Sequence, residues 1–347
     1  MNENKILIAM SGGVDSSVAA FLLKSQGFDC VGATMKLFAC DTHDANEQEQ
    51  AKKIADTLGI PFHICDLSAE FRENVVDYFI KTYVAGGTPN PCVACNRTMK
   101  FGKLLDVADS LGCGMIATGH YAKIERQADR YLIRAASDAS KDQTYVLWSL
   151  TQEQLAHTRF PLGDLSKSEI RQIALEQHFC NAHQKDSQDI CFIPNGDYVS
   201  FIERHTSLGS TPGNFVGLDG GILGQHQGLI RYTIGQRKGL GIAFGCPTYV
   251  CAKNAAENTV ILGKNEDLFT HELTAHSINL IAMPSIAAPI RVQAKVRYSA
   301  KASAATVEQI DTDRMRVRFD EAQRAVCAGQ SVVLYDGDVL LGGGIID

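Results

Sequence analysis

The chain has 347 residues, of which 45% are hydrophobic and 21% charged, so it is long enough for two or three compact domains. Its longest apolar runs are too short to span a bilayer, and residues 6–10 are too short for a signal-peptide core. We therefore expect a cytoplasmic protein without a membrane partner. The formal net charge of -6 argues against a basic surface all round, although a local basic face for RNA is compatible with it.

The first half of the chain alternates short apolar runs with helical periods. Buried strands are predicted at residues 5–10, 30–38, 61–67 and 114–120, with glycine-terminated helices between them at 16–27, 49–59 and 101–112. This alternation predicts an α/β fold, in which a parallel sheet is covered by helices on both faces. Ligands of such sheets bind at the carboxyl ends of the strands. We place this domain at residues 1–200.

The second half has a different sequence pattern. Residues 207–247 are rich in glycine with short polar and apolar alternations, and we predict a small central linking domain at residues 201–270. Further on, "IRVQAKVRYSA", "ATVEQI", "RMRVRFD" and "SVVLYDG" read as short strands separated by turns. They predict a C-terminal antiparallel β-barrel at residues 271–347.

A glycine loop, "AMSGGVDSS" at residues 9–17, joins the first predicted strand to the first helix. Its glycines let the backbone approach an anion, its serines offer hydroxyls, and the helix directs free N–H groups to the same place. A phosphate site is therefore expected. The loop lacks the Gly-Lys-Ser/Thr ending of a Walker A motif and the third glycine of the dinucleotide fingerprint.

The six residues "SGGVDS" resemble instead the PP-loop of ATP pyrophosphatases, which split ATP between the α and β phosphates. The resemblance implies that the loop grips pyrophosphate. It also implies that Asp15 helps position ATP bound with Mg²⁺.

The eleven cysteines are an odd number in a large chain, so they do not indicate a secreted disulfide framework. Two of them form Cys-X-X-Cys in "NPCVACNR" at residues 90–97, a spacing that suits a zinc site, a redox pair, an iron cluster or a catalytic centre. Cys191, in "QKDSQDICFI", has Lys185 nearby to favour a thiolate, while Asp186 and Asp189 oppose it. Five others occur in apolar or strand-like contexts and are expected to be unreactive thiols: Cys30, Cys65, Cys113, Cys251 and Cys327.

Nine segments, taken in order, resemble the bacterial tRNA-specific 2-thiouridylases (MnmA) over nearly the whole chain. They are "SGGVDSSV", "TPNPCVACNRTMKFG", "ATGHYAKI", "KDQTYVLWSL", "PLGDLSKSEIR", "SQDICFIPNGDY", "GQRKGLGIA", "VRYSA" and "LGGGII".

The resemblance implies ATP-dependent 2-thiolation of the wobble uridine, position 34, of the tRNAs for Lys, Glu and Gln. The C2 oxygen is adenylated because oxide is a poor leaving group, and sulfur then displaces AMP. By resemblance, Cys191 carries the sulfur as a persulfide and Cys95 is the nucleophile that resolves it. A transient disulfide between them would then need reduction. The implied partners are tRNA and a sulfur-carrier protein or cysteine desulfurase, with no DNA.

The resemblance also assigns binding residues. The implied ATP site consists of Ala9, Met10, Ser11, Gly12, Gly13, Val14, Asp15, Ser16, Met35 and Gly119. The implied tRNA contacts are Asn90, Pro91, Cys92, His120, Lys141, Asp142, Gln143, Arg297, Tyr298 and Gln330.

One position departs from many members of the family, which have aspartate in place of Cys92. A thiol is a weaker general acid or base than that carboxylate unless its pKa is depressed. Cys92, Cys95 and Cys191 together also suit a three-cysteine iron–sulfur cluster, which stays open as an alternative to the persulfide route. Structural zinc lacks a visible fourth ligand, so no structural metal is expected.

Two other functions stay open at this stage. The first is an RNA-binding module whose α/β half senses nucleotide, which need not consume ATP. The second is an amide-forming PP-loop enzyme, whose activity would survive replacement of Cys95 and Cys191.

Overall fold

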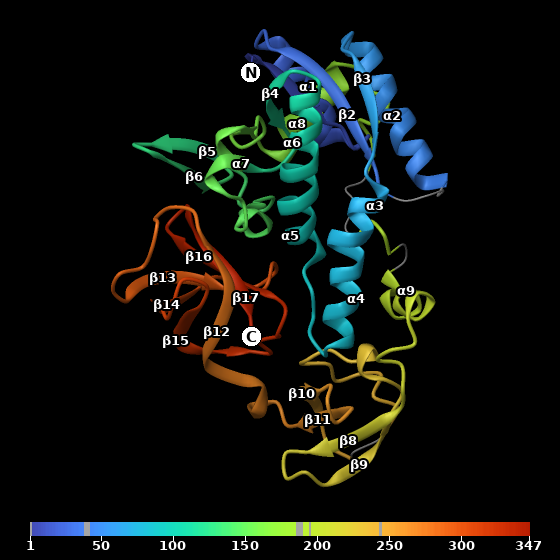
Figure 1. Cartoon of the computed structure of the whole chain (residues 1–347), viewed down its shortest axis with the longest axis vertical. Coiled ribbons are helices and arrows are strands. Elements are labelled where there is room, and N and C mark those ends of the chain that lie inside the picture. Colours follow the sequence, from blue (N-terminus) through green and yellow to red (C-terminus); the bar gives the residue numbers. More distant parts are fainter. Residues whose placement is uncertain (1, 38–41, 185–189, 194–195, 243–244) are drawn as a thin grey trace.

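The computed structural model describes residues 2–37, 42–184, 190–193, 196–242 and 245–347 (Figure 1). Within these residues the strands form a five-stranded, a four-stranded and an eight-stranded sheet. In Figure 1 the five-stranded sheet lies at the top, the eight-stranded sheet at the lower left and the four-stranded sheet at the bottom. No helix in the described part of the chain is long and apolar enough to cross a membrane.

The N-terminal sheet is parallel throughout, in the order β3-β2-β1-β4-β7. Its central strands are continuous apolar runs because both of their faces are covered. The strands are β1 (Asn2–Ala9), β2 (Asp29–Lys36), β3 (Phe62–Asp66), β4 (Cys113–Ala117) and β7 (Thr158–Arg159). The predicted parallel α/β fold is confirmed.

Helices pack on both faces of this sheet and bury two separate apolar cores against it. One core involves α1 (Val14–Ser25), α2 (Thr42–Leu58) and α8 (Lys167–Glu176), and the other involves α6 (Leu104–Ser110). The remaining helices are α3 (Ser68–Phe71), η1 (Arg72–Val76), α4 (Asp77–Val84), α5 (Pro91–Cys95), η2 (Asn96–Lys103), η3 (Thr144–Leu147), α7 (Gln152–Ala156) and α9 (Tyr198–His205).

Three predicted elements differ from the observed ones. The helix expected at 49–59 begins earlier, at Thr42. The strand expected at 114–120 ends at Ala117, because the chain turns there and brings Gly119 against the start of α1. The helix expected at 101–112 is a π-helix up to Lys103 and becomes α-helical only at Leu104. Apolar periodicity does not distinguish these two helical geometries.

The central region is a small mixed sheet in the order β10-β11-β8-β9. It buries its own cluster around Phe215, which is fully buried. The elements are β8 (Gly213–Gly217), β9 (Ile222–His226), η5 (Leu229–Arg231), β10 (Tyr249–Asn254), β11 (Thr259–Gly263) and η6 (Glu266–Leu268).

The C-terminal region is a closed six-stranded antiparallel barrel, in which β12 pairs with both β15 and β17. This confirms the predicted barrel. Its strands are β12 (Phe269–Leu280), β13 (Ile290–Lys295), β14 (Ser303–Gln309), β15 (Met315–Arg324), β16 (Ser331–Asp336) and β17 (Val339–Ile346). A hairpin of the first half, β5 (Ala122–Gln127) with β6 (Arg130–Ala135), extends the barrel sheet by pairing with β17.

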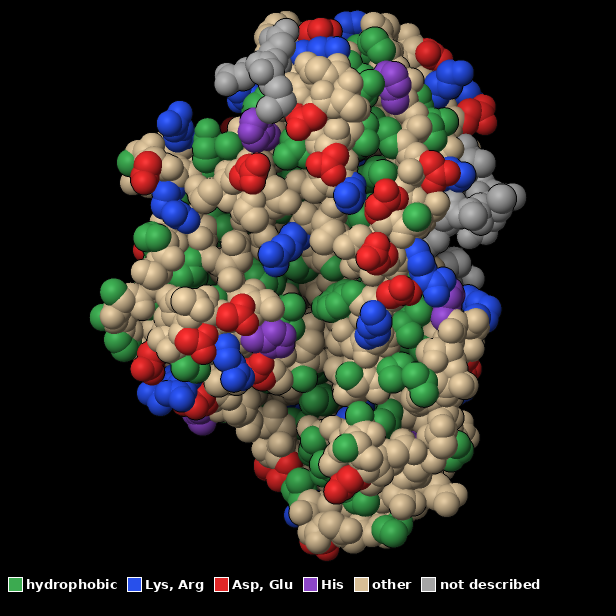
Figure 2. All heavy atoms as spheres, in the orientation of Figure 1, with side chains coloured by type: hydrophobic (Ala, Val, Ile, Leu, Met, Phe, Trp, Pro, Cys, Tyr) green, Lys and Arg blue, Asp and Glu red, His purple; other side chains and the backbone are tan. Residues whose placement is uncertain are grey.

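The barrel is joined to the N-terminal domain by side chains that bond to backbone carbonyls across the boundary. Asn279 Nδ2 donates to the carbonyl oxygens of Trp148 at 2.7 Å and Leu150 at 2.9 Å. Figure 2 shows a furrow between the barrel and α4, on a face where basic and acidic side chains are interspersed. The two domains thus share a polar boundary of defined geometry.

Candidate active site

The glycine loop lies between β1 and α1 and is folded around its own serine hydroxyls. Gly12 has φ of +79°, and a Cβ there would lie 2.5 Å from the Glu47 carbonyl oxygen, so only glycine suits the position. Ser16 Oγ donates to the Gly13 carbonyl at 3.0 Å and accepts from the Ser11 amide at 3.2 Å. The loop backbone is therefore already shaped before any phosphate binds, as an anion site at a helix N-terminus requires.

Met35 and Gly119 lie near the carboxyl ends of β2 and β4, the two strands that flank β1. A Cβ at Gly119 would be 2.8 Å from both the Asp15 carbonyl carbon and the Ser16 amide nitrogen, so no larger residue fits without movement. Met35 is the second-last residue of β2 and is half-buried. Gly119 therefore borders the loop, and Met35 lies at the same carboxyl edge of the sheet, where parallel sheets bind ligands.

Asp15, in the first turn of α1, is held by two groups that the sequence did not reveal. Lys167 Nζ donates to its two carboxylate oxygens at 2.8 Å and 2.9 Å, and Tyr121 Oη donates to Oδ1 at 2.7 Å. Lys167 comes from the first residue of α8, where Ser166 and Glu169 form a capping box. The Ser-X-X-Glu pattern predicts that helix start, but not that it faces the loop.

A buried asparagine also holds the loop. Asn181 is buried, and its Nδ2 donates to the Gly12 carbonyl at 2.6 Å and to Ser17 Oγ at 2.9 Å. Neither motif matching nor helical period marks this residue, because the contact joins segments 164 positions apart.

The two cysteines of the Cys-X-X-Cys motif lie on α5, a helix of only five residues. Asn90 is its N-cap and accepts from the Val93 amide at 3.4 Å, while Pro91 occupies a first-turn position that needs no N–H donor. Cys92 is exposed and Cys95 is buried, with 9% of its surface accessible. The two thiols therefore have different access to solvent.

Lys100 acts electrostatically on both thiols. Lys100 lies in the π-helical stretch η2, five positions after Cys95. The surrounding protein raises the pKa of Cys92 and of Cys95, and the Lys100 charge opposes this rise in both. No carboxylate pairs with the Lys100 ammonium among the ion pairs of the described residues.

Cys191 is exposed and lies in the described segment 190–193. Its neighbours Phe192 and Ile193 are buried in the same apolar cluster as Cys95. The structure thus brings the Cys191 segment to the Cys95 helix, although almost a hundred positions separate them. Lys185, Asp186 and Asp189 lie outside the described residues.

The three cysteines do not make a ready-made metal site. Among the described residues, no three His, Cys, Asp or Glu side chains converge as possible metal ligands.

His120 is a core residue in this structure. Its Nδ1 is 2.7 Å from Thr118 Oγ1, its ring packs against Phe101 and Phe160, and it is 7% exposed. Burial, with a smaller effect of Lys100, lowers the pKa of His120 well below its usual value, so the imidazole is neutral at pH 7.

The other residues expected to bind tRNA fall into two groups. Asp142 and Gln143 make local contacts, since Asp142 Oδ2 accepts from Thr144 Oγ1 at 2.6 Å and Gln143 Oε1 accepts from the Tyr121 amide at 2.9 Å. Lys141, half-buried, lies beside them. Arg297 and Tyr298, by contrast, are exposed on the barrel, and Tyr298 Oη reaches the Asp142 carbonyl at 3.4 Å.

Gln330 joins the barrel to the segment that precedes α5. Its Nε2 donates to the carbonyl oxygens of Thr88 at 3.0 Å and Pro89 at 3.1 Å. In this structure its amide nitrogen is thus used within the protein.

The sequence matches known domain families along almost its entire length. Residues 4–195 match the tRNA methyl transferase HUP domain, residues 200–264 the tRNA methyl transferase PRC-barrel domain, and residues 270–346 the aminomethyltransferase beta-barrel domain.

Full-length relatives and one solved structure are also similar to this chain. It is 49% identical to the tRNA-specific 2-thiouridylase MnmA of Clostridioides difficile (strain 630), covering 100% of this chain and 99% of that protein. It is 48% identical to the protein of the same name from Clostridium acetobutylicum, covering 100% of both. The U34-tRNA thiolase NcsA from Methanococcus maripaludis with its [4Fe-4S] cluster has a TM-score of 0.37 at 17% identity, covering 58% of this chain and 64% of that one. A structural likeness at this level has no bearing on mechanism.

Identity close to one half over complete chains, with the glycine loop and both cysteine segments in place, shows that the chain belongs to the tRNA-specific 2-thiouridylase family.

Proposed function

We propose that this chain is an ATP-dependent tRNA-uridine 2-sulfurtransferase that acts on the wobble uridine of the tRNAs for Lys, Glu and Gln. The observation that carries the proposal is the placement of the Cys95 helix and the Cys191 segment in one apolar cluster. Leu67, which directly follows β3, belongs to that cluster, and Met35, the second-last residue of β2, packs against it. The cluster therefore borders the same sheet edge as the glycine loop.

The nucleotide half of the reaction rests on the loop around Asp15. The loop amides and the N-terminus of α1 bind the phosphates, and Lys167 supplies positive charge beside them. Asp15 provides the carboxylate that Mg²⁺ requires alongside phosphate oxygens, so the donor set fits that ion. When bound, Mg²⁺ would neutralise part of the triphosphate charge.

The first step joins AMP to the C2 oxygen of the uridine and releases pyrophosphate. The terminal sulfur of a Cys191 persulfide then attacks C2, a C–S bond forms, and AMP leaves with the C2 oxygen. A Cys95 thiolate attacks the Cys191 sulfur, which breaks its bond to the transferred sulfur and leaves C2=S in the base. The two cysteines end as a disulfide that a thiol reductant cleaves.

Further assignments belong to the proposal. The sulfur donor is a persulfide-bearing carrier protein or a cysteine desulfurase, and the reductant places the reaction in the cytoplasm. Asn90, Pro91 and Cys92 border the target base, which must leave the anticodon stack to be reached. Arg297, with Lys141, neutralises tRNA phosphates. The domain limits are 1–200, 201–270 and 271–347.

The test is thiolation of an unmodified tRNA transcript with ATP and a persulfide donor, read by mass spectrometry of its nucleosides. Wild type should form 2-thiouridine, whereas Cys95→Ser and Cys191→Ser should not, although tRNA-dependent pyrophosphate release continues in both. Product formation by both variants would exclude this mechanism. Absence of tRNA-dependent pyrophosphate release in wild type would favour the nucleotide-sensing RNA binder.

The cluster route requires its own measurement. Iron and acid-labile sulfide are quantified in protein purified without oxygen. Iron-free protein that thiolates tRNA supports the persulfide route. A content of about four irons per chain would instead support the iron–sulfur route and exclude the persulfide-only mechanism.

A further inference from the structure

The segment between α4 and α5 carries the cysteine helix but has no regular structure of its own. Residues 87–90 are neither helix nor strand, and α5 begins directly after them and continues without a break into η2 and α6. In Figure 1 the chain leaves the lower end of α4, beside the central domain, and rises into α5. What holds this segment therefore bears on the first turns of that helical stretch, which carry Cys92 and Cys95.

The barrel holds one side of the segment. The Thr88 amide donates to the Ala328 carbonyl at 2.8 Å, and Gln330 binds the next two carbonyls as described above. The packing is tight, because a Cβ at Gly329 would lie 3.1 Å from the Thr88 carbonyl oxygen and 2.9 Å from Thr82 Cγ2.

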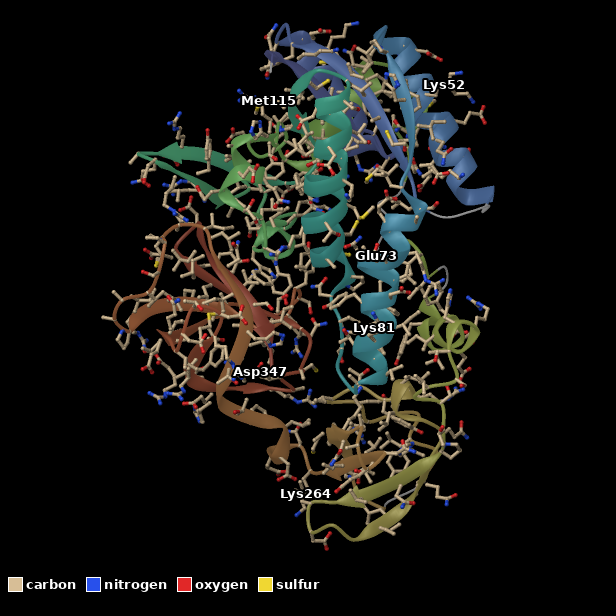
Figure 3. The ribbon with its side chains drawn as sticks, viewed as in Figure 1. Lys52, Glu73, Lys81, Met115, Lys264 and Asp347 are labelled. Atoms are coloured by element: carbon tan, nitrogen blue, oxygen red, sulfur yellow. The ribbon has the colours of Figure 1, made fainter. Side chains whose placement is uncertain are left out.

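The central domain holds the other side through Lys253 of β10. Its Nζ lies 2.9 Å from the Tyr232 carbonyl oxygen and 3.5 Å from the Gly87 carbonyl oxygen. A Cβ built on Gly86, which has φ of +87°, would be 3.6 Å from Lys253 Cβ, so the lysine stem also lies against this backbone. Figure 3 shows the lower end of α4, marked by Lys81, directly above the central domain, marked by Lys264.

Lys253 is an unusual residue to find in such a place. Burial lowers its pKa to about 8, and the neighbouring Cys327 partly opposes this shift. Among the ion pairs of the described residues none joins Lys253 to a carboxylate, and its Nζ bonds to carbonyl oxygens. A buried ammonium without a carboxylate costs stability, and an apolar side chain would fill the same space at lower cost. Stability alone therefore does not explain a lysine here.

We propose that Lys253 is a positioning residue for the reaction proposed above: from the central domain, its ammonium holds the Gly87 carbonyl and thereby sets the place of Asn90 and the Cys92–Cys95 helix. The central domain then contributes to catalysis by holding the segment before α5 from one side, while the barrel turn at residues 328–330 holds it from the other. This inference rests on the proposed function only for its kinetic readout.

The test uses hydrogen–deuterium exchange and steady-state kinetics on the full chain. Lys253→Met should speed exchange in peptides covering residues 86–95 at least several-fold while the global unfolding midpoint stays close to wild type. It should also lower kcat for thiolation about tenfold with little change in the KM for ATP, because the glycine loop is untouched. Lys253→Gln, which keeps an N–H donor but loses the charge and the reach to Gly87, should show the same local exchange and serves if the methionine variant does not fold.

The matched control is Arg130→Met. Arg130 also bonds to backbone carbonyls across a domain boundary, those of Ile281 at 3.0 Å and Leu280 at 3.1 Å, but far along the chain from this segment. Unchanged exchange at 86–95 in both Lys253 variants, or an equal increase in Arg130→Met, would overturn the proposal. If wild type fails to thiolate tRNA, the proposed function fails, whereas the exchange result still decides the role of Lys253.

Discussion

At the scale of single residues, the ion pair between Lys167 and Asp15 places a positive charge beside the loop that should hold the triphosphate. We expect Lys167→Met to raise the KM for ATP about tenfold, equivalent to about 1.4 kcal/mol of binding. Without the Lys167 ammonium, the negative charge of the Asp15 carboxylate is no longer neutralised and repels the triphosphate. Stability should change by less than about 1 kcal/mol, because the pair is partly exposed. Pyrophosphate release measured against ATP concentration checks the prediction.

Lys123→Met is the control for that experiment. Lys123 pairs with Asp164 at 2.6 Å. Asp164 is close in sequence to Lys167, and no ion pair of the described residues joins Lys123 to Asp15. An equal rise in the KM for ATP in both variants would show that the effect is not specific to the loop.

The charge of Lys100 should be measurable in the reactivity of the cysteine motif. Since that charge opposes the desolvation that raises the pKa of Cys92 and Cys95, Lys100→Met should raise both pKa values further. Alkylation by iodoacetamide at pH 8, followed peptide by peptide with mass spectrometry, should slow several-fold at the exposed Cys92. Lys103→Met, which removes a lysine paired with Asp106 on the same helix, should leave the rate unchanged. Equal rates in all three proteins would disprove the electrostatic role.

The depressed pKa of Lys253 gives stability a defined pH dependence. Its pKa is about 8 in the folded protein and near 10.4 in an unfolded chain, so between these values the unfolded state binds more protons. Stability contributed by this residue must then rise with pH, by up to about 1.4 kcal/mol per pH unit. Urea denaturation at pH 7, 8 and 9 should show that the free energy of unfolding of wild type increases relative to that of Lys253→Met as pH rises. A constant difference would mean that Lys253 does not titrate in this range.

At the scale of elements, Asn90 caps the start of the helical stretch that begins with α5. Asn90→Ala removes the acceptor for the Val93 amide and should lower the free energy of unfolding by about 1 kcal/mol. Thiolation should fall much more than this loss explains, since the helix carries Cys92 and Cys95. Thr151→Ala, which removes the cap of α7, should cost similar stability and leave thiolation intact. Urea denaturation measures the loss of stability, and initial rates of thiolation measure the loss of activity. Equal thiolation rates in Asn90→Ala and Thr151→Ala would contradict the prediction.

Elements were predictable from the sequence where one local rule decided them. Apolar runs placed β1 to β3, and two glycines followed by serines placed the loop after β1. The π-helical stretch that contains Lys100 was not predictable, because α- and π-helices share the same apolar spacing within a few residues. Likewise, Lys167 and Asn181 reach the loop across more than 150 positions, and a single sequence does not record such pairs.

At the scale of the whole molecule, the domains are joined by bonds to backbone carbonyls more than by charge pairs. Asn279 from the barrel, Gln330 from the barrel and Lys253 from the central domain each reach carbonyl oxygens of the first domain. Strand patterns predicted the barrel itself, but not that the hairpin β5–β6 would extend its sheet, since pairing with β17 depends on how the domains dock. Because the proposed reaction needs loop, cysteines and barrel together, these bonds should control activity as well as stability.

The single tryptophan of the chain gives a direct probe of this docking. Trp148 is 1% exposed and lies against β17, where a Cβ at Gly343 would be 2.9 Å from its ring. Asn279→Ala leaves two carbonyls at this boundary without their donor and should cost about 1–3 kcal/mol. We expect tryptophan emission to change at lower urea in this variant, ahead of the loss of far-ultraviolet circular dichroism. Gln309→Ala, which removes bonds to Ile286 and Asp311 inside the barrel region, should not separate the two signals. Coincident transitions in Asn279→Ala would mean that the barrel and the first domain unfold as one unit regardless of this contact.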